Sequence, residues 1–178
     1  MSLKKVKIIS SIGIFLLCFL FHFIYEWIPN TVTSIFFPVN ESIWEHMKLL
    51  FSSVIFYGII NYLILQKFNI KYNNFFTSLF ISALLIIPIY LIMFLPVYYK
   101  IGNRMIITIS LMFLSIILSQ VISYYILKYK DLKNINILSI ILIIISYIVF
   151  AYLTYYPIKT EFFFDPLKEK YGINNYNI

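Results

Sequence analysis

The sequence predicts an all-α fold, an integral membrane bundle of five transmembrane helices. The first observation is composition, because 62% of the 178 residues are hydrophobic and only 12% are charged, more apolar surface than a water-soluble domain of this size can bury. The second is that the chain contains five apolar segments, each close to the about 20 residues that cross a bilayer core. The third is that segments such as 137–150 are apolar on every side, whereas the strands of a membrane barrel alternate between polar and apolar residues.

The five helices together define a predicted transmembrane domain at 1–157, with spans at about 8–28, 44–66, 75–97, 105–127 and 135–157. The first span follows a basic start but lacks a small-x-small cleavage site, so we interpret it as a retained helix and not as a signal peptide. Residues 158–178 form a predicted C-terminal extramembrane tail. Because three consecutive phenylalanines at 162–164 would be unusual in a free end, we expect the tail to anchor at the membrane surface or to fold over the bundle.

The net charge of +7 is distributed in a way that predicts an orientation. Eight basic residues flank the end of the bundle that holds the N-terminus, and six flank the other end: Lys4, Lys5, Lys7, Lys67, Lys71, Lys128, Lys130 and Lys133 against Lys48, Lys100, Arg104, Lys159, Lys168 and Lys170. By the positive-inside rule, this bias favours a bacterial cytoplasmic membrane protein with its N-terminus inside and its C-terminus outside. The predicted partners are therefore membrane lipids and not nucleic acid.

The densest polar cluster lies at the predicted outer face, where the second helix begins. Both histidines of the chain, His22 and His46, and three of its seven acidic residues, Glu26, Glu41 and Glu45, fall between positions 22 and 46. Ionisable groups at membrane depth are costly, and they usually face a protein interior, a cavity or an ion. We therefore predict the functional site at this edge of the membrane.

The spacing of these residues favours a metal centre. His22 and Glu26 lie four residues apart and share a face near the end of the first helix. A short connection makes the first two helices antiparallel neighbours, so imidazole and carboxylate groups converge from two helices, as in the metal sites of helix bundles. We predict that His22, Glu26 and His46 bind a divalent metal, either zinc or, with more carboxylate ligands, iron or manganese. Glu45 is an alternative carboxylate ligand.

The predicted catalytic residues are Glu41, Glu45 and Lys48, which share one face of the second helix. Glu41 is the predicted general base, acting on a metal-bound water. Helix structure explains part of the same cluster, because Ser42 and Glu45 have the spacing of a capping box and Glu45 and Lys48 that of an ordinary helical ion pair. Other residues predicted to belong to the site are Asn40, Ser42, Trp44, Asp165 and Tyr171.

Three functions are compatible with this cluster. The leading hypothesis is a metal-dependent, membrane-embedded hydrolase or transferase that acts on a lipid or lipid-linked substrate. The first alternative is a small ion, proton or solute transporter that uses Glu41, Glu45 and His46 as a relay, since intramembrane glutamate and histidine chains carry protons in pumps and transporters. The second alternative is an accessory membrane subunit in which the cluster is purely structural.

Several strings in the chain resemble the signatures of an uncharacterised family of small bacterial multi-pass membrane proteins that carry an N-E-S-x-W-E-H-x-K motif. These strings are HFIYEW at 22–27, FPVNESIWEHMK at 37–48, FDP at 164–166 and YGI at 171–173. The resemblance implies that the tail belongs with the cluster, with Asp165 and Tyr171 folded over the outer site. The chain is also loosely similar to intramembrane alkaline-ceramidase-like hydrolases, which combine histidines, an acid and a serine within helices, and this similarity implies metal-dependent lipid hydrolysis.

Overall fold

The computed structural model describes residues 1–102 and 104–173. The described residues form six α-helices, of which five are long and apolar enough to cross a membrane. The helices are α1 (Leu3–Trp27), α2 (Thr31–Phe36), α3 (Ile43–Lys67), α4 (Phe75–Ile101), α5 (Met105–Lys128) and α6 (Lys133–Tyr155). The predicted all-α membrane bundle with five spans is therefore confirmed. The largest difference in the bounds is at the start of α1, where the Ser2 side chain accepts a hydrogen bond from the Lys5 amide and caps the helix.

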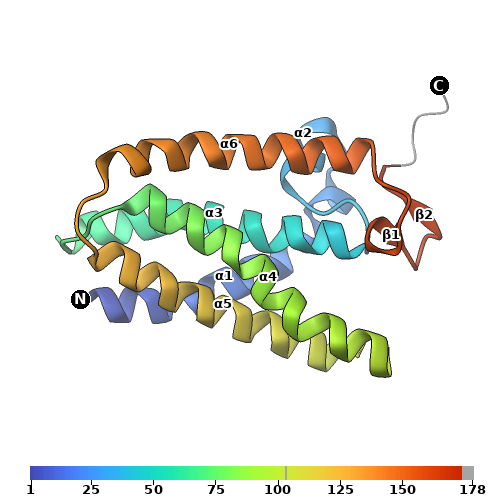
Figure 1. The fold of residues 1–178 in the computed structure, drawn as a ribbon, viewed down its shortest axis with the longest axis horizontal. Coiled ribbons are helices and arrows are strands. Elements are labelled where there is room, and N and C mark those ends of the chain that lie inside the picture. Colours follow the sequence, from blue (N-terminus) through green and yellow to red (C-terminus); the bar gives the residue numbers. More distant parts are fainter. Residues whose placement is uncertain (103, 174–178) are drawn as a thin grey trace.

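The five long helices run along the longest axis of the molecule, and the N-terminus and the strands of the tail lie at opposite ends (Figure 1). α1 contacts α3 and α5, whereas α4 contacts α3, α5 and α6. The core where these helices meet is apolar, with Ile14, Phe51, Ile86 and Ile116 fully buried. α3 has the largest buried share of the five spans, and its polar residues Lys48, Ser52 and Asn61 are buried inside the protein.

A short helix and a loop close the end of the bundle where α1 ends and α3 begins. Asn30 caps the short helix α2: its side chain accepts from the Thr33 amide, and the Thr33 hydroxyl accepts from the Asn30 amide. α2 packs against α6 and lies at the same end as the tail (Figure 1). The segment 37–42 then leads into α3, and the Ser42 side chain caps that helix by accepting from the Glu45 amide.

The tail after α6 folds back over this same end. It contains a 3₁₀ turn, η1 (Glu161–Phe163), and two short antiparallel strands, β1 (Phe164–Asp165) and β2 (Lys170–Tyr171). After β2, Gly172 adopts a positive φ of 56°, and a side chain at this position would collide with the Thr154 carbonyl. Residues 174–178 of the predicted tail lie outside the described residues. The described part of the tail thus sits next to the polar cluster.

Candidate metal-binding site

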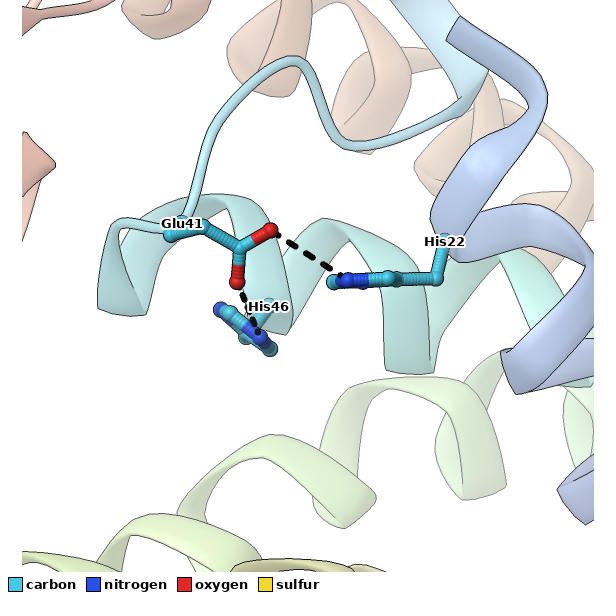
Figure 2. Close-up of side chains that lie close together, drawn as sticks. All are labelled: His22, Glu41 and His46. Carbon is cyan, nitrogen blue, oxygen red and sulfur yellow. Dashed lines mark ion pairs between the residues drawn. The ribbon is translucent and has the colours of Figure 1, made fainter. Parts of the chain in front are cut away.

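Three side chains from two helices and one loop converge at this end of the bundle. His22 lies near the end of α1, Glu41 lies in the segment before α3, and His46 lies in the first turns of α3 (Figure 2). His22 Nε2 is 3.2 Å from Glu41 Oε1, and His46 Nε2 is 3.6 Å from Glu41 Oε2. One ligand atom from each residue lies within 4.8 Å of the other two, so this group could hold a metal ion.

The distances within the group suit a small divalent cation. Zinc binds nitrogen and oxygen ligands at about 2.0–2.2 Å in a tetrahedron, which places neighbouring ligand atoms roughly 3.3–3.6 Å apart. The two contacts between histidine and glutamate, at 3.2 and 3.6 Å, are close to that separation. All three side chains are partly exposed, at 26%, 33% and 29% for His22, Glu41 and His46, so an exchangeable ligand could reach the same position.

The hydrogen bonding of His46 defines which nitrogen faces the group. Its Nδ1 is 2.9 Å from the Ser42 carbonyl oxygen, and because a carbonyl oxygen only accepts, Nδ1 carries the proton. In a neutral imidazole, Nε2 then presents a lone pair opposite the Glu41 carboxylate. That contact is repulsive unless a proton or a cation lies between the two atoms. A backbone carbonyl that fixes the tautomer in this way is the usual outer partner of a metal-binding histidine.

The electrostatic surroundings keep Glu41 ionised. A hydrogen bond from His22 is the largest cause that lowers the pKa of Glu41 below its ordinary value, and the charge of Lys168 and the charges that His46 and His22 carry when protonated act in the same direction. Partial burial opposes them. Because Lys168 belongs to the tail, the folded tail contributes to the charge balance of the group.

Glu45 and Lys48, in the first turns of α3, form a separate network that is fully buried. Their ion pair measures 2.6 Å, and both side chains are at most 1% exposed. Lys48 also donates to the Ser34 carbonyl and the Thr154 hydroxyl, and Thr154 in turn donates to Glu45 Oε1 at 2.6 Å. Glu45 Oε2 accepts from the Val39 amide. The network joins α2, α3 and α6 and fixes the segment that carries Glu41.

Hydrogen bonds to the tail also hold the segment 37–42 in place. Asp165 is completely buried and accepts hydrogen bonds from the amides of Leu167 and Lys168 in its own turn and from the amide of Glu41. The Asn40 side chain donates to the Gly172 carbonyl and accepts from the Ser42 amide. These bonds set the position of Glu41 through contacts between residues more than 120 positions apart in sequence.

The remaining predicted site residues have supporting positions. Trp44 packs its ring against Phe150 and Phe163, each 5.0 Å away between ring centroids, and Tyr171 packs against Phe164 in the strand pair. Glu26, a predicted metal ligand, is exposed and lies outside the group of three. Glu41, the predicted base, takes the carboxylate position between the two histidines instead.

Two cavities meet at the group of three. The first, which we call the apolar cavity, has a volume of about 290 Å³ and lies among α1, α3, α4 and α5. The second, the tail cavity, has a volume of about 810 Å³ and lies between the ends of α3, α4 and α5 and the tail. Four residues line both cavities: Glu41, His46, Tyr90 and Thr108. The candidate ligands therefore separate an apolar compartment from a more polar one.

Two residues of this end of the bundle, Glu161 and Thr154, were not predicted from the sequence. Glu161 of η1 lines the tail cavity together with Glu41 and His46, and Thr154 closes the buried network. The only local signal for Glu161 is its position directly before the three phenylalanines, which indicate the membrane surface. Thr154 lies in the last turn of an apolar helix, and its sequence context carries no sign of a carboxylate partner.

Comparison with known proteins places the chain in a family but gives no activity. No curated protein and no solved structure matches the chain. A model of a protein family does match it, over residues 1–173. The similarity to ceramidase-like hydrolases stays a prediction. With the match covering all the described helices and the tail, the chain belongs to the family of unknown function DUF6512.

Proposed function

We propose that this protein is a membrane-embedded, metal-dependent hydrolase of a lipid or lipid-linked substrate. The observation that carries the proposal is the position of His46, whose Nδ1 bonds the Ser42 carbonyl while Nε2 lies opposite Glu41. This arrangement has the donor set and the outer hydrogen bond of a histidine and carboxylate metal site. His22 and His46 would supply the nitrogen ligands and Glu41 the oxygen ligand.

The two cavities support a lipid as the substrate. Phe19, Phe23 and Met105 line the apolar cavity and are also exposed on the outer surface of the bundle, by 40%, 42% and 75%. That surface faces lipid chains in a membrane, so an acyl chain could enter beside these residues. The headgroup would then lie in the tail cavity, and the scissile bond would lie next to the group of three.

Hydrolysis at this position needs a Lewis acid and a proton carrier. A divalent cation held by the group of three would polarise the carbonyl or phosphoryl oxygen of the substrate. Glu161 is the one other carboxylate that lines the tail cavity among the described residues. In our proposal, Glu161 takes a proton from the attacking water and returns it to the leaving alcohol oxygen or amine nitrogen as the ester or amide bond breaks.

The experiment is a product assay on the metal-supplemented protein in nanodiscs. Phosphatidylglycerol, phosphatidylethanolamine, diacylglycerol and ceramide are offered separately, and released products are measured by mass spectrometry. We expect turnover of at least one lipid, reduced roughly 10²-fold or more by Glu161→Gln, which removes a general base. Glu169→Gln changes an exposed acid of the same tail and serves as the matched control. Absence of products from all four lipids, together with a flux driven by a pH gradient in liposomes, would favour the transporter and overturn the proposal.

A further inference from the structure

A third cavity lies at the opposite end of the bundle, between α1 and α5. Its volume is about 340 Å³. Its polar lining comes from Lys4, Lys7, Ser11, Gln120 and two tyrosines, Tyr124 and Tyr125, and no acidic residue lines it among the described part of the chain. We call it the lysine cavity. It is separate from the candidate metal-binding site, because Lys7 lies in the first turns of α1 and His22 near the end of that helix.

Lys7 is a buried lysine with no acidic partner among the described residues. Its side chain is only 9% exposed, and its ammonium group donates to the neutral Gln120 carbonyl oxygen at 3.3 Å. No ion pair involves Lys7 among residues 1–102 and 104–173. The buried Lys48 differs, since it has a carboxylate at 2.6 Å and two further acceptors. A buried lysine keeps its charge at little cost only when an anion pairs with it, and no anion among the described residues pairs with Lys7.

Two further lysines raise the positive charge around the cavity. Lys4 lines it directly. Lys128 donates to the Tyr124 hydroxyl at 3.3 Å and lies over the ring of the same tyrosine, 5.1 Å from its centroid. Ammonium groups and tyrosine hydroxyls are donors that suit a phosphate group, and the cavity offers both, from Lys4, Lys7, Tyr124 and Tyr125.

The rim of the lysine cavity is apolar and faces outward. Ile8 and Val121 line the cavity and are 55% and 47% exposed on the surface of the bundle. In a membrane this surface contacts acyl chains, whereas the lysines lie at the level of the headgroups, because α1 begins only a few residues earlier. An inorganic anion would make no use of such a rim. Basic pockets between transmembrane helices commonly bind anionic lipid headgroups.

We propose that the lysine cavity binds the headgroup phosphate of an anionic phospholipid, with Lys7 as its buried counter-ion and an acyl chain lying along Ile8 and Val121. This inference does not depend on the proposed enzymatic activity. The bound lipid would fill the space between α1 and α5, the helices that also line the apolar cavity at the other end.

The test is native mass spectrometry of the full chain, delipidated in detergent and titrated with phosphatidylglycerol or with phosphatidylcholine. We expect one phosphatidylglycerol to bind in preference to phosphatidylcholine, and Lys7→Met to weaken that first binding event at least roughly fivefold. Lys5→Met is the matched control, because Lys5 is an exposed neighbour that does not line the cavity. It should leave the first binding event unchanged.

Three results would overturn the proposal. The first is equal binding of the two lipids by the wild-type chain, a comparison that does not depend on whether the Lys7→Met variant folds. The second is equal loss of binding in Lys5→Met and Lys7→Met, which would indicate general surface charge. The third is stabilisation of delipidated protein by inorganic phosphate with no further gain from phosphatidylglycerol, which would identify a soluble anion as the ligand.

Discussion

At the scale of single residues, the stability of the site depends on the buried pair of Glu45 and Lys48. Every polar atom of the two side chains has a partner: the Lys48 ammonium has three acceptors, and the carboxylate of Glu45 accepts from Thr154, Val39 and Lys48. Such a network contributes specificity more than net stability, because removing two charges from water is costly. Breaking it on one side, however, leaves an unpaired buried charge.

We therefore predict that Lys48→Met lowers the free energy of unfolding by about 3–5 kcal/mol, the usual effect of removing one member of a buried ion pair. The measurement is chemical or thermal unfolding of the purified protein in detergent. The double variant Glu45→Gln/Lys48→Met should recover part of the loss, because the glutamine side chain is neutral and its carbonyl oxygen could still accept from Thr154. The exposed Lys71→Met serves as the control. A Lys48→Met protein as stable as Lys71→Met would contradict the assignment.

At the scale of secondary-structure elements, hydropathy predicts the five spans because the bilayer sets the length of each apolar segment. The meeting of His22 and His46 could also be anticipated, since a short connection makes α1 and α3 antiparallel neighbours. The choice of Glu41 and not Glu26 as the third group could not. That choice depends on the conformation of the segment 37–42. Two hydrogen bonds to the tail hold this segment, one from the Asn40 side chain to the Gly172 carbonyl and one from the Glu41 amide to Asp165. Local sequence patterns carry no information about such contacts.

The structure of the tail, too, could be predicted only in part from the sequence. The three phenylalanines indicated that residues 162–164 contact apolar surroundings, and Phe163 is buried against Trp44. The η1 turn that places Glu161 at the tail cavity, and the strand pair that follows it, depend on packing against α3 and on the buried Asp165. Elements of two or three residues have too little local preference to be predicted from the sequence.

At the scale of the whole molecule, the five spans place the N-terminus and the strand β2 of the tail at opposite ends of the bundle (Figure 1). The group of three and the tail lie at the C-terminal end, and the lysine cavity at the N-terminal end. If the charge bias determines orientation, the candidate metal site faces the outside and the lysine cavity lies in the cytoplasmic leaflet, where anionic lipids attract basic residues.

This orientation predicts the labelling of single cysteines in intact cells. In a Cys18→Ser background, Lys168→Cys in the exposed turn of the tail should react with a membrane-impermeant maleimide. Lys71→Cys, in the exposed connection between α3 and α4, should react only after lysis. The reverse pattern would place the candidate metal site inside the cell.

Metal binding by the group of three is tested by the metal content of the purified protein, determined by inductively coupled plasma mass spectrometry after purification without chelators. We compare the wild type with Glu41→Gln, which keeps the size of the side chain but removes the carboxylate, and with Glu26→Gln, the exposed acid outside the group. We expect about one zinc, iron or manganese ion per chain in the wild type and in Glu26→Gln, and a roughly tenfold or greater loss in Glu41→Gln. A folded wild type without metal, or equal metal in wild type and Glu41→Gln, would contradict it.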